Sequence, residues 1–227
     1  MPVTPYRFSP HSFLDRLDDA EQAFLLSLAP IRKFPRRSIL LFQDDLGDRI
    51  VLLTAGRVKV SRLDAKGREV MLSIRDPGDL LGEISFIDGD TRTASVTALE
   101  PVEAILAPVE TLRECLNTHP RVAVVLLETV TQRFREINTR LWQLGAADAL
   151  GRLSARIVEL AERYGVECDD GILIESSISQ EDLAAWSGCS RAALGDALRS
   201  LRTAGWLRTG RNSMVVLDIE ALRARAA

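Results

Sequence analysis

Residues 179–204 read SQEDLAAWSGCSRAALGDALRSLRTA, and this stretch decides how the C-terminal third of the chain folds. Ser179 precedes Asp182 by three residues, the spacing of a capping box at a helix start, with aspartate in place of glutamate. Gly188 can adopt the left-handed conformation that a tight turn between two helices needs. Ser190 can then cap a second helix, in which leucines recur at helical spacing. Two short helices joined in this way form a helix-turn-helix.

The residues that follow the second helix extend this pattern. Gly205-Trp206-Leu207 ends the helix, and RTGRNSMVVL at 208–217 predicts a small hairpin, which would form a wing. The chain has a net charge of −3, yet residues 191–211 contain a single acid, Asp196, among their arginines. Such a basic stripe suits contact with DNA phosphates, although a solvated face or a helical hairpin without a DNA role would share some of these features. Because caps, turn glycine, wing and stripe occur together, the sequence predicts binding of double-stranded DNA.

A different pattern occupies the N-terminal half. Between Ile31 and Leu106, short β-type runs alternate with turn signals such as AKGRE at 65–69 and RDPGD at 75–79. Short strands with regular turns predict an antiparallel barrel or sandwich. Residues 9–29 carry apolar residues at helical spacing, which predicts one short amphipathic helix before the strands. The β-type runs are SILLFQ, RIVLLTAG, RVKVSRL, EVMLSIR, ASVTAL and VEAILA.

A long helix is expected after His119-Pro120, because proline is favoured in a first helical turn. Its apolar residues then alternate between steps of three and four, the spacing of a coiled-coil seam. A lone helix of this length is marginal in water, so the seam needs a partner, either the chain's own barrel or a second copy. The strict alternation favours the second copy and hence a homodimer. The predicted interface consists of Leu127, Val130, Phe134, Ile137, Leu141 and Leu144.

The pattern changes again at residues 145–148, where Gly145 weakens the long helix. Asp148 can cap a further helix over 149–164, and VECDDG at 166–171 then predicts a loop. We therefore expect an α+β protein with three parts. These are a β-rich domain over 1–119, a dimerisation helix and hinge over 120–147, and a winged helix-turn-helix domain over 148–227.

The segment GEISFIDGDTRTA at 82–94 combines groups that could bind one anion. Gly82 permits close backbone approach, and the turn after it can present free N–H groups. The planar fork of Arg92 matches phosphate geometry, and Thr93 adds a hydroxyl beside it. Glu83 fits such a site only if it accepts hydrogen bonds from sugar hydroxyls. Each residue also has a plainer interpretation, as a solvated carboxylate, a surface ion pair or an ordinary strand residue.

From about residue 20 to 225 the chain resembles the CRP/FNR family of cyclic AMP receptor-like regulators. The resemblance is carried, in order, by GDLLGEISF at 78–86, RTA at 92–94, the long helix after 120, and SQEDLA…SGCSR at 179–191. It implies an N-terminal β-roll, a jelly-roll-like cyclic-nucleotide-binding domain, followed by a long dimerisation helix and a C-terminal winged helix-turn-helix.

In the ligand site, the resemblance implies that Glu83 binds the ribose 2′-hydroxyl and that Arg92 and Thr93 hold a cyclic phosphate. Arg133 matches an arginine that closes over the nucleotide near Glu83. Asn138 matches a polar residue that reaches the base from the partner subunit. The implied ligand-binding set is Gly82, Glu83, Ile84, Arg92, Thr93, Arg133, Ile137 and Asn138.

Two positions depart from the family pattern. Ile137 stands where cyclic AMP binders usually place a threonine, and Arg75 stands where an apolar pocket wall is usual. The resemblance implies a cyclic nucleotide, cAMP or cGMP, as allosteric effector and no obligatory cofactor. The alternative is a regulator that binds DNA without cyclic AMP, its pocket empty or holding another ligand.

At the DNA, the resemblance implies that Arg191 reads a guanine and that Ser179 and Gln180 contact phosphates on a near-palindromic operator. Ala192 and Asp196 replace the family's usual Glu and Arg or Lys, which predicts a different operator. RNA polymerase is a further candidate partner. The implied DNA-binding set is Ser179, Gln180, Ser190, Arg191, Ala192, Gly195, Asp196 and Arg199.

Other classes of protein are not indicated. The N-terminal MPVTPYRFSP lacks the pattern of a signal peptide, and no apolar run approaches the roughly 20 residues of a membrane helix. Three scattered cysteines and two histidines predict no disulfide, iron–sulfur, haem or other metal site. No nucleophile–base pair indicates an enzyme, and a regulatory subunit or channel gate built on the same β-roll would need a catalytic or membrane segment. We expect a cytoplasmic protein without membrane contact.

Overall fold

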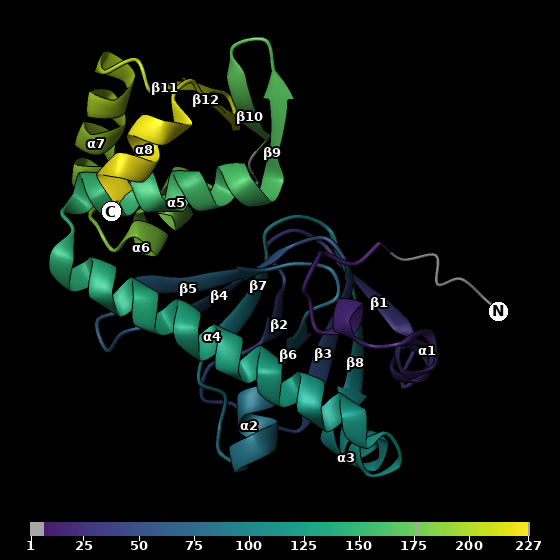
Figure 1. Ribbon diagram of the computed structural model, residues 1–227. Helices are drawn as coiled ribbons and strands as arrows, with labels where there is room; N and C mark the ends of the chain where they lie inside the picture. The colour runs from purple at the N-terminus through teal and green to yellow at the C-terminus, as the bar shows by residue number, and fades with distance from the viewer. Residues whose placement is uncertain (1–6, 176, 227) are drawn as a thin grey trace. The chain divides into compact units, whose positions relative to one another are not determined.

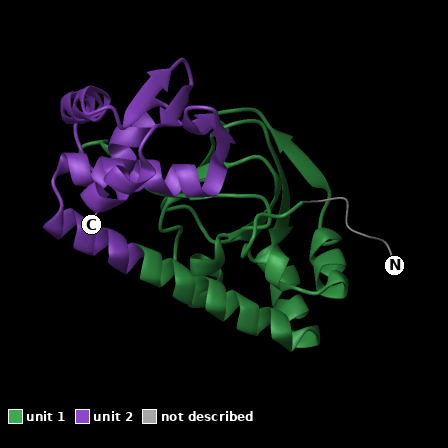
Figure 2. Cartoon of the chain, turned by 45° about the horizontal axis from the view of Figure 1, so that its top comes forward, with its two compact units in different colours: residues 1–136 green, residues 137–227 purple. Residues whose placement is uncertain are grey.

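The computed structural model describes residues 7–175 and 177–226. The chain forms two compact units, Met1–Glu136 and Ile137–Ala227, drawn in green and purple in Figure 2. The boundary falls within helix α4 (Pro120–Ala146), so the predicted dimerisation helix belongs partly to each unit. The predicted domain limits at 119 and 147 stay a prediction.

The N-terminal unit contains two four-stranded antiparallel sheets, with strand orders β1-β8-β3-β6 and β2-β7-β4-β5 (Figure 1). Their facing surfaces share one apolar core, which confirms the expected β-roll. The strands are β1 (Ile31–Phe34), β2 (Ile39–Leu41), β3 (Arg49–Ala55), β4 (Val58–Leu63), β5 (Glu69–Arg75), β6 (Leu80–Leu81), β7 (Ser95–Ala98) and β8 (Val102–Pro108).

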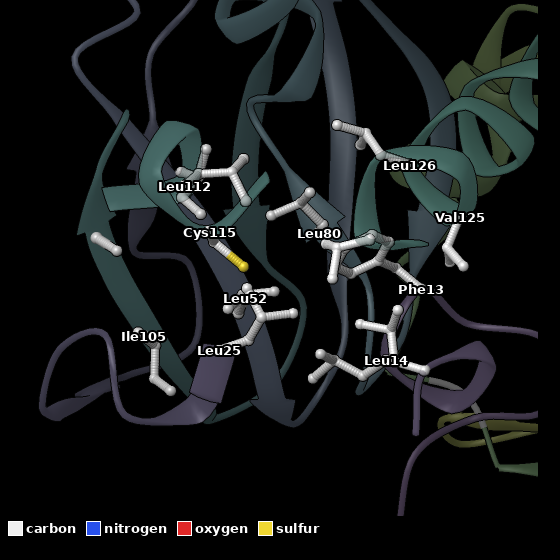
Figure 3. Close-up of a cluster of buried hydrophobic side chains, with 14 residues drawn as sticks. Phe13, Leu14, Leu25, Leu52, Leu80, Ile105, Leu112, Cys115, Val125 and Leu126 are labelled. Atoms are coloured by element: carbon white, nitrogen blue, oxygen red, sulfur yellow. The ribbon is translucent and has the colours of Figure 1, made fainter. Parts of the chain in front are cut away.

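Strand β3 contributes to two cores at once. Its residues alternate between faces, so Val51 and Leu53 pack with the second sheet, while Ile50 and Leu52 pack with the helices. Burial on both faces explains why this strand is apolar without alternation. Figure 3 shows the core on the helix side, where Leu52 packs among Phe13, Leu14, Leu25, Leu80, Ile105, Leu112, Cys115, Val125 and Leu126.

The helical elements of this unit are η1 (Leu14–Arg16), α1 (Asp19–Leu26), α2 (Glu83–Asp88), α3 (Val109–Thr118) and the first part of α4. The predicted single helix over 9–29 is wrong. Asp18 has extended backbone, and its carboxylate accepts hydrogen bonds from the N–H groups of Ala20 and Glu21, so a new helix begins there. Strands β1 and β6 and helix α3 lie outside the sequence predictions.

The C-terminal unit combines helices with a four-stranded antiparallel sheet of order β11-β12-β10-β9. Asp148 caps α5 by accepting a hydrogen bond from the Gly151 N–H, as the sequence predicts. The elements are α5 (Ala149–Tyr164), β9 (Gly165–Cys168), β10 (Gly171–Glu175), α6 (Gln180–Ser187), α7 (Arg191–Thr203), β11 (Leu207–Gly210), β12 (Ser213–Val216) and α8 (Ile219–Ala226).

Two features of this unit differ from or add to the sequence analysis. The first three residues of the predicted loop VECDDG belong instead to strand β9, which forms a hairpin with β10. Strand β10 also pairs with the wing strand β12. Helix α8 lies outside the sequence predictions; it packs along α5 and buries Leu222. The predicted wing is confirmed as the hairpin of β11 and β12.

Candidate ligand site and nucleic-acid interface

Helix α2 starts at a glycine whose backbone and contacts both exclude a side chain. Gly82 is the N-cap, with a φ of 85° in the left-handed region. A Cβ atom there would lie 2.6 Å from Nη1 of Arg92, so any side chain would displace the guanidinium. Gly82 therefore allows Arg92 to lie directly against the start of the helix.

The guanidinium of Arg92 is buried and held by oxygen atoms of the chain itself. It donates to Ser85 Oγ at 2.6 Å, to the Gly82 carbonyl at 3.2 Å and to the Arg49 carbonyl, and Asp48 lies 3.9 Å away. Burial lowers the pKa of Arg92, and the carboxylate of Asp48 acts in the opposite direction. Arg92 is therefore a positioned cation. An anionic ligand could accept the hydrogen bonds that Arg92 now donates to these neutral oxygens.

A surface hollow of about 430 Å³ also reaches Arg92. Asp45 and Asp48 line it, and their carboxylates oppose an anion on that side. This hollow therefore does not favour an anion. Thr93, the next residue along the chain, is exposed.

Arg133 of α4 joins that helix to the floor of the site. Its guanidinium pairs with Glu83 at 2.6 Å and Asp79 at 3.2 Å, and donates to the Leu80 carbonyl at 2.9 Å. Burial opposes the charge of Arg133, but Glu83 and Asp79 outweigh it and raise its pKa. The Nε–H of Arg133 is buried without a hydrogen-bond partner in the described part of the chain, which leaves one free donor beside Glu83.

Arg75, at the end of β5, forms a second link to α4. Two nitrogens of its guanidinium share one carboxylate oxygen of Glu136, each at 3.3 Å, and the side chain is 13% exposed. Burial lowers the pKa of Arg75, and nearby Arg133 acts in the same direction. The position that departs from the family pattern thus holds a buried cation with a long-range partner.

Helix α4 has two apolar faces with different roles. Val122, Val125 and Leu126 are buried in the core on the helix side. The predicted seam occupies another face, where Val130 is half-buried and the remaining residues are exposed. The first unit therefore leaves its own seam residues Leu127 and Phe134 uncovered. The exposed fractions are 66% for Leu127, 62% for Phe134, 52% for Ile137, 60% for Leu141 and 53% for Leu144.

Helix α7 presents its polar residues on the side opposite its core. Leu194, Leu198 and Leu201 are buried. Arg191 pairs with Glu181 of α6, and Arg199 pairs with Asp196 at 2.9 Å. These ion pairs lie in solvent, where DNA phosphates could compete for the arginines at little cost. The exposed residues of α7 are Arg191, Ala192, Gly195, Asp196, Arg199, Ser200, Arg202 and Thr203.

The turn between α6 and α7 has the predicted geometry. Ser179 and Asp182 form both hydrogen bonds of a capping box, and Ser190 accepts a hydrogen bond from the Ala193 N–H. Gly188 ends α6 with a φ of 61°. The hydroxyls of Ser179 and Ser190 thus serve as helix caps, a role that the sequence predicts for both.

Known proteins share both halves of this arrangement. Residues 31–119 match the cyclic nucleotide-binding domain, and residues 151–225 match the Crp-like helix-turn-helix domain. The CRP-like cAMP-activated global transcriptional regulator of Mycobacterium tuberculosis is 31% identical over 204 residues, which is 90% of this chain and 91% of that protein. The cyclic AMP receptor protein of Thermus thermophilus is 30% identical over 87% of this chain and 88% of its own.

The chain belongs to the CRP/FNR family. It is a DNA-binding transcription regulator of that type, with a cyclic nucleotide-binding domain. The fold also matches the solved structure of the c-di-GMP responsive global regulator CLP of Xanthomonas campestris, with a TM-score of 0.81 over 88% of this chain and 100% of that one, at 21% identity. In the described part of the chain, no helix is long and apolar enough to cross a membrane, and no group of three or more metal-binding side chains is found.

Within this CRP/FNR framework, the structure brings Gly82, Glu83, Arg92 and Arg133 together. Two further predicted ligand residues of the same unit, Ile84 and Thr93, are exposed. Ile137 and Asn138 are exposed on the part of α4 that belongs to the second compact unit. The residues that complete the site lie outside the sequence predictions. They are Asp79, Ser85 and Glu136. Asp79 and Glu136 are brought in by contacts with Arg133 and Arg75, which are 54 and 61 residues away, and Ser85 by its hydrogen bond from Arg92.

A further contact that the sequence does not reveal lies behind the helix-turn-helix. Arg152 of α5 donates to the carbonyls of Ala147 at 2.6 Å, Ser187 at 2.9 Å and Gly188 at 3.1 Å. It therefore ties the segment after α4 to the turn before α7. One side chain thus links the end of α4 to the turn from which α7 begins.

Proposed function

We propose that this regulator is a homodimer that binds a cyclic nucleotide in its β-roll and a near-palindromic operator with its two α7 helices. The observation that carries the proposal is the group formed by Gly82, Glu83, Arg92 and Arg133, which combines an anion site with a carboxylate for sugar hydroxyls. Relatives named as cAMP-activated regulators support a cyclic nucleotide as effector. Cyclic AMP and cyclic GMP share the cyclic phosphate and the ribose, so these four residues suit either.

The residues fit such a ligand chemically. Arg92 can donate two parallel hydrogen bonds to a phosphate, and Glu83 can accept from a ribose hydroxyl. The unpartnered Nε–H of Arg133 offers a further donor. Thr93, Ile137 and Asn138 remain candidate ligand contacts.

The exposed seam on α4 supports the dimer. A continuous row of leucine, phenylalanine and isoleucine side chains at coiled-coil spacing would bury its apolar area against the same row of a second copy. Two α7 helices would then read half-sites about one helical turn of DNA apart, roughly 34–36 Å, the spacing general to dimeric helix-turn-helix proteins, the type member of this family among them. RNA polymerase is a further proposed partner, and the cytoplasm is the proposed location.

One observation favours the second candidate, a regulator that binds DNA without cyclic AMP. The donors of Arg92 and the carboxylate of Glu83 already have partners within the chain. A ligand must replace these contacts, and a chain that keeps them permanently would not respond to a nucleotide.

Isothermal titration calorimetry of the purified protein with cAMP, cGMP and cyclic di-GMP separates the two candidates. We expect binding of a cyclic mononucleotide, weakened tenfold or more in Arg92→Ala, because a charge-assisted bidentate contact contributes on the order of 1.5–3 kcal/mol. Arg32→Ala, which removes an exposed arginine of β1, is the matched control and should bind like wild type. Absence of binding at millimolar concentrations of every nucleotide would favour the second candidate.

A further inference from the structure

Five charged residues of the N-terminal unit are connected partly by contacts and partly by neighbouring positions in the chain. Arg92 lies against the start of α2, Glu83 and Arg133 pair at 2.6 Å, and Arg75 pairs with Glu136. Gly82, whose carbonyl accepts a hydrogen bond from Arg92, directly precedes Glu83, and Glu136 lies about one helical turn after Arg133 on α4. The contacts therefore run in order from Arg92 through Glu83 and Arg133 to Glu136 and Arg75. The charges of Glu83 and Arg133 both act on Arg75.

This order has a consequence for a nucleotide bound as proposed above. With its phosphate on Arg92 and its ribose on Glu83, the base must continue on the far side of Glu83 from Arg92. That is the side on which Arg75 lies. The base would therefore meet a buried guanidinium instead of an apolar wall.

Building on the proposed function, we propose that Arg75 reads the base of the effector and makes this regulator selective for a cyclic guanine nucleotide. A guanidinium has donors only. The N7 and O6 atoms of guanine are two adjacent acceptors, and an arginine fork can donate to both. Adenine has an acceptor at N7 but an amino donor at N6. One N–H group of the Arg75 guanidinium would therefore face another donor and stay without a hydrogen bond away from solvent.

The existing contact of Arg75 can be exchanged for this one. Both of its hydrogen bonds to Glu136 are long, at 3.3 Å, and converge on a single oxygen, so the fork is not matched to its partner. Glu136 is 36% exposed and can be solvated when released. Because Glu136 belongs to α4, the exchange would also loosen one tie between β5 and that helix, which gives base recognition a direct effect on the helix.

Calorimetry of the full chain with cyclic GMP, cyclic AMP and cyclic IMP tests the inference. Cyclic IMP keeps the N7 and O6 acceptors of guanine but lacks its 2-amino group. We expect wild type to bind cyclic GMP and cyclic IMP at least tenfold more tightly than cyclic AMP. This comparison needs no variant, so a folding defect cannot obscure it.

Two variants assign the preference to the side chain. Arg75→Met should reduce cyclic GMP binding tenfold or more and bring it close to that of cyclic AMP, whose binding should change little. Glu136→Gln weakens the partner of Arg75 but leaves the fork, so the preference for guanine should persist or increase. Thermal melting without ligand checks that both variants are folded.

The outcomes that contradict the inference are distinct from failure of the proposed function. Equal or tighter binding of cyclic AMP by wild type would overturn the role of Arg75 while leaving a cyclic-nucleotide effector in place. Tight binding of cyclic GMP but not of cyclic IMP would place recognition on the 2-amino group and overturn the proposed fork contact. Binding of no cyclic nucleotide would overturn both the proposed function and this inference.

Discussion

Arg92 and Arg133 in the N-terminal unit are 3% and 10% exposed, whereas Arg191 and Arg199 on α7 are 72% and 70% exposed. Each buried arginine has several partners, including backbone carbonyls. Each exposed arginine pairs with a carboxylate that water can replace. A buried arginine can therefore bind a ligand only by exchanging contacts that also hold the fold together, whereas an exposed one can bind by releasing a solvated carboxylate.

The largest effect is expected for the substitution of a buried arginine. Arg133→Met leaves Glu83 and Asp79 buried without a cation, which should lower the free energy of unfolding by about 3–5 kcal/mol. Urea titration followed by circular dichroism would measure the loss. The three tryptophans, Trp142, Trp186 and Trp206, all belong to the second unit, so their fluorescence reports that unit separately.

Arg199→Ala is the matched control for this substitution, because it removes an arginine whose ion pair is exposed. Its free energy of unfolding should stay within about 0.5 kcal/mol of wild type. If both substitutions lower the free energy of unfolding equally, burial does not decide how much an arginine contributes to stability.

The exposed face of α4 gives the next largest effect, on association instead of folding. Phe134→Lys would place a charge in the middle of the proposed interface and weaken the dimer by several kcal/mol. Sedimentation equilibrium should show a shift toward monomer. Thr139→Lys adds the same charge outside the seam and should leave the dimer intact. An unchanged dimer in Phe134→Lys would place the interface elsewhere.

The contrast between regions also explains which parts could be predicted from the sequence. Helix ends are local: Ser179, Asp182 and Ser190 satisfy backbone groups within three residues, so their spacing alone predicts the cap geometry. The seam of α4 is likewise a property of one helix. The error over residues 9–29 has a local cause too, since the capping box at Asp18 starts a new helix inside an apolar pattern that continues across it.

The buried charges could be predicted only in part, because their partners come from distant segments. The resemblance to the family indicates Arg92, Glu83 and Arg133, but not Asp79, which is 54 residues from Arg133. The pairing of Arg75 with Glu136 spans 61 residues and has no sequence motif. Such contacts depend on how α4 packs on the sheets, and no local spacing encodes that packing.

The smallest effect is expected for a substitution in the exposed ion pair of α7. Asp196 pairs with Arg199 at 2.9 Å on the face of α7, and both side chains are solvated. Asp196→Ala should change the free energy of unfolding by less than about 0.5 kcal/mol, because an exposed ion pair contributes little. It should nevertheless strengthen binding to random-sequence DNA, since it removes a charge that repels phosphate and frees Arg199 to contact it.

The salt dependence of binding distinguishes these two causes. Each added phosphate contact steepens the slope of log K against log salt by about 0.9, so release of Arg199 should steepen it by about one. Fluorescence anisotropy with a labelled non-operator duplex over a series of salt concentrations measures the slope. In the double variant Asp196→Ala with Arg199→Ala, the added slope should disappear, because the cation that made the new contact is gone. An unchanged slope in Asp196→Ala would mean that Arg199 does not reach the DNA and that the ion pair has no part in DNA binding.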